Sequence, residues 1–95
     1  MGDTMLHLAV ESGALEDIDV LVACGANINA VGDIGNTPLH SAALTGNIAA
    51  ANKLLGLGAD PKLKNEFDQT PADVAKLGGR RELADILGNY RRRRT

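Results

Sequence analysis

Aromatic residues are nearly absent from this 95-residue chain, which has one Phe, one Tyr and no Trp. A chain of this length forms a single small domain. Because large rings are so scarce, its core must be built from Leu, Ala, Ile and Val, and such small aliphatic side chains favour closely packed helices. The shortage therefore favours a core between helices.

The chain also lacks cysteine pairs and long apolar runs. Its single cysteine, Cys24, excludes an internal disulfide and fits a reducing compartment. We expect Cys24 to be an ordinary, partly buried residue, because no base in "LVACGAN" would activate its thiol. No run reaches the roughly eighteen apolar residues of a membrane span, and "MGDTMLH" has none of the regions of a signal peptide. We therefore expect an intracellular, cytoplasmic protein.

Basic residues are missing from one half of the chain. Residues 1–50 contain six acids and no Lys or Arg, whereas residues 51–95 contain ten bases and six acids. Most of the basic excess is a terminal run, Arg91, Arg92, Arg93 and Arg94. Such a run is typical of a nuclear signal or of a contact with nucleic acid or an anionic membrane surface. A solvated chain end explains it equally well, so both interpretations stay open.

A period of 33 residues organises the whole chain. Thr4, Thr37 and Thr70 are spaced at this interval, and laying 2–34 on 35–67 gives nine identities. Self-similarity at a fixed period indicates a stacked repeat architecture. We expect repeats at about 2–34, 35–67 and 68–90, forming one domain over 1–90, followed by a basic tail at 91–95.

Each repeat is predicted to contain a turn and two helices. Thr37 is a favourable N-cap, Pro38 has the backbone angle of a first helical residue, and Gly46 is suited to end the helix. A second helix is predicted through "NIAAANKLLGL", closed by Gly58, because its apolar residues recur at helical spacing. The turn-forming residues of "ADPKLKNEFDQ" predict a protruding loop or hairpin.

The motifs "TPLHSAALTGN", "TMLHLAVESGA", "LVACGANINA" and "LLGLGADPKL" resemble the ankyrin repeat, over essentially the whole chain. The resemblance implies an all-α solenoid of stacked antiparallel helix pairs with protruding β-turn or hairpin loops. It also implies a concave surface, made by loop tips and first helices, that binds a partner protein. The expected function is that of an adaptor or regulatory domain, with no catalysis of its own.

The two ends of the predicted array differ. In the third repeat, polar residues or glycine replace residues of the second repeat at four positions (Asp73, Lys76, Arg81, Gly88). We interpret this as a C-terminal cap, since terminal repeats need a polar outer face. The first repeat keeps apolar residues at five positions (Met5, Leu6, Leu8, Ile18, Val20). The chain could be cut from a longer array, dimerise here, or tolerate an exposed patch; we favour a monomer over a homodimer.

The neighbours His40 and Ser41 suggest a catalytic pair, but the repeat argues against one. His7 occupies the position of His40, and the resemblance implies that this histidine, with Thr, fixes the loops through hydrogen bonds. Ser41 occupies a core-facing position. The histidines and the cysteine match no metal-ligand spacing, and no glycine-rich phosphate loop is present. We therefore expect no catalytic residue, metal or cofactor.

The candidate partner-binding residues follow from the resemblance, which places variable positions at loop tips and on first helices. Ile34 and Phe67 are the strongest candidates, because a large apolar side chain at a loop tip gains nothing from solvent. The alternative for Phe67 is that it folds back onto the neighbouring hairpin. The full set is Glu11, Ser12, Val31, Asp33, Ile34, Asn36, Leu44, Thr45, Lys64, Glu66, Phe67, Gln69 and Leu77.

Overall fold

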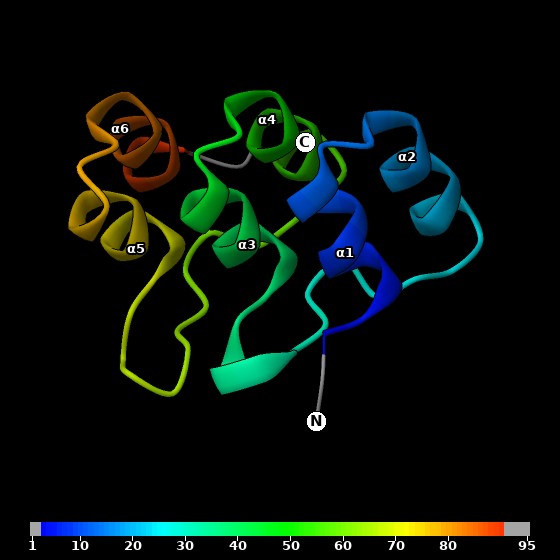
Figure 1. Ribbon diagram of the computed structural model, residues 1–95, viewed down its shortest axis with the longest axis horizontal. Helices are drawn as coiled ribbons and strands as arrows, with labels where there is room; N and C mark the ends of the chain where they lie inside the picture. Colours follow the sequence, from blue (N-terminus) through cyan, green and yellow to red (C-terminus); the bar gives the residue numbers. More distant parts are fainter. Residues whose placement is uncertain (1–2, 91–95) are drawn as a thin grey trace, which may run out of the picture.

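The structure, a computed structural model, describes residues 3–90 (Figure 1). Within this range the chain forms six α-helices in three antiparallel pairs and no strand. The helices lie in two rows, with α1, α3 and α5 in one and α2, α4 and α6 in the other (Figure 1). Their bounds are α1 Met5–Ser12, α2 Leu15–Ala23, α3 Pro38–Thr45, α4 Ile48–Gly56, α5 Pro71–Leu77 and α6 Arg81–Asn89. None of these helices is long and apolar enough to cross a membrane.

The predicted helix signals are confirmed in the second pair, α3 and α4. The Thr37 hydroxyl accepts a hydrogen bond from the His40 backbone N–H, and Pro38 is the first helical residue. Gly46 ends α3 at a φ of 72°, in the left-handed region that favours glycine. Gly58, which follows α4, also has a left-handed backbone. The N–H groups of Gly58 and Ala59 bond back to the last carbonyls of that helix, which ends it as predicted.

The core lies between the two rows and is built from aliphatic side chains, as the composition predicts. Leu39 and Leu54 are fully buried, and alanines such as Ala42 and Ala51 let neighbouring helices approach closely. Leu6 and Ile18, which we expected on the exposed end of the array, are also buried. That expectation was wrong. Successive residues on a helix point about 100° apart, so the five apolar residues cannot all lie on one face. Leu6 and Ile18 point into the core instead.

Cys24 and Tyr90 lie at the ends of second-row helices. The thiol-bearing Cys24 follows α2 and is exposed, which corrects the expected partial burial. Tyr90 follows α6 and packs partly against the core, and its hydroxyl donates to the Leu55 carbonyl at 3.3 Å. The last helix is thereby fastened to the second pair.

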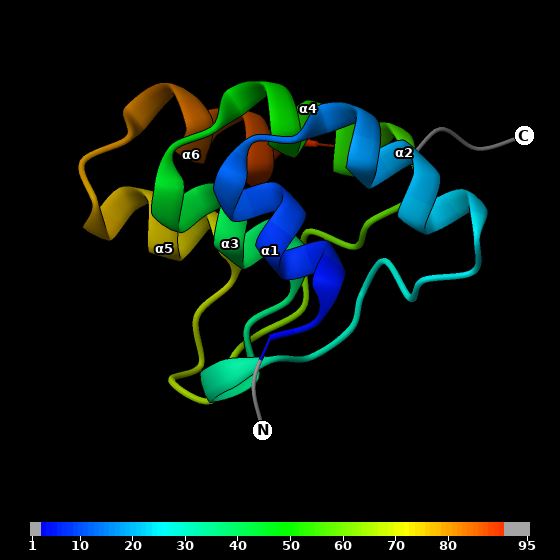
Figure 2. The ribbon, with the colours of Figure 1, turned by 45° about the vertical axis from the view of Figure 1, so that its right-hand side comes forward.

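The loops before α3 and α5 project from the first-row side of the array (Figure 2). Each is closed by a turn, with the Gly32 N–H bonded to the Asn36 carbonyl at 2.8 Å and the Asn65 N–H to the Gln69 carbonyl at 2.9 Å. The first loop contains a short 3-10 segment, η1 Asp33–Gly35. The Glu66 N–H donates to the Ile34 carbonyl at 2.9 Å. The loops are therefore joined turns rather than β-hairpins.

Candidate partner-binding surface

His40 connects the second helix pair to the loop that follows it. Its Nδ1 accepts from the Thr37 N–H at 3.0 Å, which leaves the ring proton on Nε2, and Nε2 donates to the Gln69 carbonyl at 2.8 Å. The ring is fully buried, and this burial lowers the pKa of His40. A neutral ring is therefore held in place, and its two nitrogens position the second loop.

The first pair repeats this arrangement and the third changes it. His7 Nδ1 accepts from the Thr4 N–H at 3.1 Å, and its Nε2 bonds to the Asn36 carbonyl at 2.7 Å. In the third pair, Asp73 accepts from the Thr70 N–H at 3.0 Å, a bond that lowers the pKa of its carboxyl. A carboxylate has no N–H to donate to a following loop. The predicted scaffold role of both histidines is confirmed.

Ser41 is buried but makes no bond to His40. Its hydroxyl donates to Glu11 Oε2 in the first pair, at 3.3 Å. Burial, and after it the Asp3 carboxyl, raise the pKa of Glu11. Since both ring nitrogens of His40 are engaged, the ring cannot take a proton from the serine. Among residues 3–90, no three His, Cys, Asp or Glu side chains lie together in a way that could hold a metal ion.

A groove of about 280 Å³ runs between the loops and the first-row helices α3 and α5. We call it the concave groove. Its exposed apolar residues are Ile34, Leu44 and Leu77, one from the first loop and one from each helix. Five of the predicted residues line it, together with five that were not predicted: Ile34, Asn36, Leu44, Gln69 and Leu77, with Ala43, Asn65, Val74, Gly78 and Arg80.

Phe67 lies at the tip of the second loop, between Asn65 and Gln69, which both line the concave groove. Phe67 itself is not part of the lining. Its side chain is 63% exposed, so the alternative that it folds back onto the neighbouring loop is wrong. The buried Asn65 holds the tip, because its Oδ1 accepts from the N–H groups of Phe67 and Gln69 at 2.9 and 3.0 Å. The aromatic ring is thus presented to solvent on a fixed turn.

Asn36 is a correction to the predicted surface. Its side chain is only 7% exposed, and its Oδ1 accepts from Asn65 Nδ2 at 3.0 Å. This hydrogen bond between two side-chain amides joins the first loop to the second. It satisfies a buried donor, the Nδ2 group of Asn65, that would otherwise need another partner. Asn36 therefore belongs to the framework beneath the groove, and we remove it from the candidate contact residues.

Arg80 is the most informative residue that sequence reasoning missed. It precedes α6, yet its Nη2 donates to the Leu44 carbonyl of α3 at 3.1 Å. A cation near a helix C-terminus interacts favourably with the free carbonyls there. In the sequence, Arg80 is visible only as a basic residue that follows Gly78 and Gly79. This position does not reveal that its side chain extends back to the second helix pair.

The remaining predicted residues lie outside the concave groove. Glu11 and Ser12 line a separate hollow at the first pair. Thr45 is exposed, and its hydroxyl donates to the Ser41 carbonyl of its own helix at 3.1 Å. Four residues are exposed on the loops: Val31, Asp33, Lys64 and Glu66. The run Arg91 to Arg94, to which we assigned a nucleic-acid or membrane contact, lies outside the described residues.

A family model describing ankyrin repeats in three copies matches residues 1–65. This span covers more than half of the chain and includes both Thr–His pairs and the first of the two loops that they hold. The second loop continues to Gln69, beyond the match. The chain belongs to the ankyrin-repeat family. Ankyrin repeats are in general protein–protein interaction modules and typically non-enzymatic. A search of curated proteins gives no match. The third pair of this ankyrin-repeat protein lies beyond the matched span, and it is the pair in which aspartate replaces the histidine.

Proposed function

We propose that this ankyrin-repeat protein is an adaptor or regulatory module that binds a partner protein through the concave groove and the loop tips. We also propose that it does so inside the cell, in the cytoplasm. The predicted residues that carry the contact lie around the groove and at the second tip. Four of them have exposed side chains, Ile34, Leu44, Phe67 and Leu77, and the fifth, Gln69, is partly buried.

The backbone of Ile34 is the observation that carries this proposal. Its φ of 50° lies in the left-handed region, where a β-branched residue is an outlier. Holding such a residue there costs on the order of 1 to 3 kcal/mol, whereas glycine adopts this conformation freely. The side chain is nonetheless large, apolar and 45% exposed. Neither the turn nor solvent favours isoleucine here, so a contact with another molecule is the better explanation.

The lining of the concave groove indicates what the partner offers. Leu44 and Leu77 supply apolar contact area, and the Arg80 guanidinium lies at the edge. Arginine is well suited to bind a carboxylate. A matching segment would therefore carry a large apolar residue with an acid beside it. Because the Asn65 network fixes the neighbouring turn before binding, little ordering is required of the loop.

A site-specific photo-crosslink tests the proposal. A photoreactive phenylalanine analogue replaces Phe67 in one protein. In the control it replaces Leu57, which is exposed and does not line the concave groove. Captured proteins are identified by mass spectrometry. We expect a protein captured through position 67 and not through position 57. Equal capture from both positions, or no capture from position 67, would contradict the proposed surface.

Two substitutions then separate binding from folding. Phe67→Ala should weaken binding of the captured protein while leaving the melting temperature nearly unchanged, since the ring is exposed. Ile34→Gly should weaken binding and also stabilise the fold by about 1 kcal/mol, because it relieves the left-handed isoleucine. Calorimetry measures both quantities. A large stability loss from either change would show that the residue is structural.

A further inference from the structure

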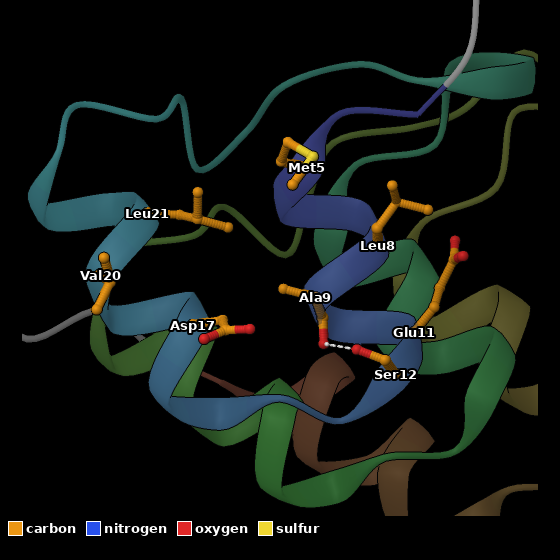
Figure 3. Close-up of a pocket in the computed structure, with 8 residues that line it drawn as sticks. All are labelled: Met5, Leu8, Ala9, Glu11, Ser12, Asp17, Val20 and Leu21. Carbon is orange, nitrogen blue, oxygen red and sulfur yellow. Dashed lines mark hydrogen bonds between the residues drawn. The ribbon is translucent and has the colours of Figure 1, made fainter.

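A second hollow lies at the outer side of the first helix pair, away from the concave groove. Its volume is about 690 Å³, and Figure 3 shows Leu21 and Asp17 projecting from α2 toward α1, along which Met5 and Leu8 lie. Leu8 is 52% exposed, and Met5 and Val20 are also exposed. We call this hollow the end groove. It is lined by Met5, Leu8, Ala9, Glu11, Ser12, Asp17, Val20 and Leu21.

The other two pairs show what kind of object this surface fits. Leu8 occupies the repeat position of Ser41 and Val74, which are both buried. In those pairs the preceding helices cover the position, since α1 packs on α3 and α3 packs on α5. The same surface of the first pair is uncovered within residues 3–90. Because helices cover the equivalent surface in the other two pairs, we expect this surface to accept a helix, as in other helix-in-groove contacts.

The charge around the end groove is of one sign. Glu11 and Asp17 line it, and Glu16 and Asp19 are exposed on α2. Residues 1–50 contain no Lys or Arg at all. The one described ion pair on this side joins Asp19 to Lys53 of α4, at 2.8 Å. A helix that settles here meets an apolar strip bordered by carboxylates, which favours lysine and arginine along its flanks.

A second copy of this chain fits the end groove poorly. A symmetric dimer through this face would place Glu11 and Asp17 against the same acids of the other copy, with no base from residues 1–50 between them. A head-to-tail contact would present the outer face of the third pair. There Lys76 and Arg81 stand where the second pair has Ala43 and Ile48. The hollow on that face is lined by Lys76, Gly79, Arg81, Ala84 and Asp85, so it offers no large apolar side chain to fill the end groove.

We infer that the end groove binds a basic amphipathic α-helix of a partner protein. Its apolar side would rest on Met5, Leu8 and Leu21, and its lysines or arginines would lie beside Glu11 and Asp17. This contact is separate from the concave groove, because the two surfaces share no lining residue. It therefore stands or falls independently of the proposed function.

A pair of synthetic helical peptides tests the inference with the 95-residue protein. Both carry leucine at i, i+3, i+4 and i+7; one has lysine at the flanking positions and the other glutamate. Fluorescence anisotropy measures the affinity of each. The lysine peptide should bind at least about tenfold more tightly than the glutamate peptide, and added salt should weaken its binding. Failure of the lysine peptide to bind, or equal binding of both peptides, overturns the inference.

Matched variants locate the contact. Leu8→Asp should reduce the affinity for the lysine peptide by at least about tenfold, and Asp17→Asn should reduce it less. Leu57→Asp, at an exposed leucine outside both grooves, should leave it unchanged. Circular dichroism checks that each variant is folded. An equal loss from Leu57→Asp overturns the assignment, as does a concentration-dependent dimer in sedimentation that Leu8→Asp abolishes, since the occupant would then be a second copy.

Discussion

The first and third helix pairs have the same architecture but opposite outer surfaces. The first exposes Met5, Leu8 and Val20 to solvent beside carboxylates. The third places Lys76 and Arg81 on its outer side, and its Thr–His cap becomes a Thr–Asp cap with no donor for a further loop. In a stacked array each pair is stabilised mainly by its neighbours. The neighbour-facing position that is apolar and exposed on the first pair is therefore matched on the third pair by an outer side that carries charged residues.

Equivalent leucines in the three pairs give the largest expected effects. Leu54 and Leu87 are buried, whereas Leu21 is only partly buried in the end groove. Leu54→Ala should cost about 2 to 5 kcal/mol of unfolding free energy, Leu87→Ala a similar amount, and Leu21→Ala about 1 kcal/mol. Urea denaturation measures all three. If Leu21→Ala costs as much as Leu87→Ala, Leu21 is buried in solution. That result would contradict the exposed outer surface of the first pair.

The cap residues should show the next largest difference. His40→Ala leaves the Thr37 N–H and the Gln69 carbonyl without their ring partners. We expect a loss of about 2 to 6 kcal/mol, since two groups lose their partner and each buried orphan group costs about 1 to 3 kcal/mol. Asp73→Ala should cost less, because Asp73 joins only its own helix cap. Equal losses in thermal denaturation would show that the loop contact of His40 adds nothing.

The stability should also depend on pH through His40, which the third pair lacks. Burial lowers the pKa of His40 in the folded protein from its usual 6.5. The unfolded chain therefore takes up this proton at a higher pH than the folded chain does, and acidification favours unfolding. We expect the unfolding free energy to decrease as the pH falls from about 7 to 5. His40→Gln should flatten that decrease in parallel urea titrations; an unchanged slope would contradict the assignment.

The smallest effect on stability is expected at the end groove itself. Leu8→Lys gives the first pair an outer residue of the kind found on the third. Because the side chain is exposed, the unfolding free energy should change by no more than about 0.5 kcal/mol. Binding of a hydrophobic fluorescent dye should nevertheless fall. If dye binding is the same as in the unaltered protein, the exposed apolar surface lies elsewhere.

The repeat scaffold could be predicted because its signals are local and occur more than once. Thr37, Pro38 and Gly46 each act within a single helix, and the 33-residue period carries their meaning to the other pairs. The scaffold role of His7 and His40 followed from the same repetition together with the family resemblance. These features depend on backbone hydrogen bonds and preferred backbone angles, which short stretches of sequence determine.

The candidate surface was harder to predict, because it depends on which way single side chains turn. Asn36 and Asp33 are three residues apart in one loop, yet one is buried against Asn65 and the other is exposed. Arg80 reaches the groove from the start of a second-row helix. The left-handed backbone of Ile34 is also invisible in the sequence, since glycine or asparagine would be expected there. These outcomes arise from contacts between neighbouring pairs.

The hydrogen bond from Tyr90 to the Leu55 carbonyl gives the protein an internal optical reporter. Tyr90 is the only tyrosine and there is no tryptophan, so the tyrosine fluorescence comes from one ring at the junction of the second and third pairs. Far-ultraviolet circular dichroism instead sums the helices of all three pairs. Comparing the two signals during denaturation reveals whether the carboxyl-terminal pair detaches before the rest of the array melts, without any added label.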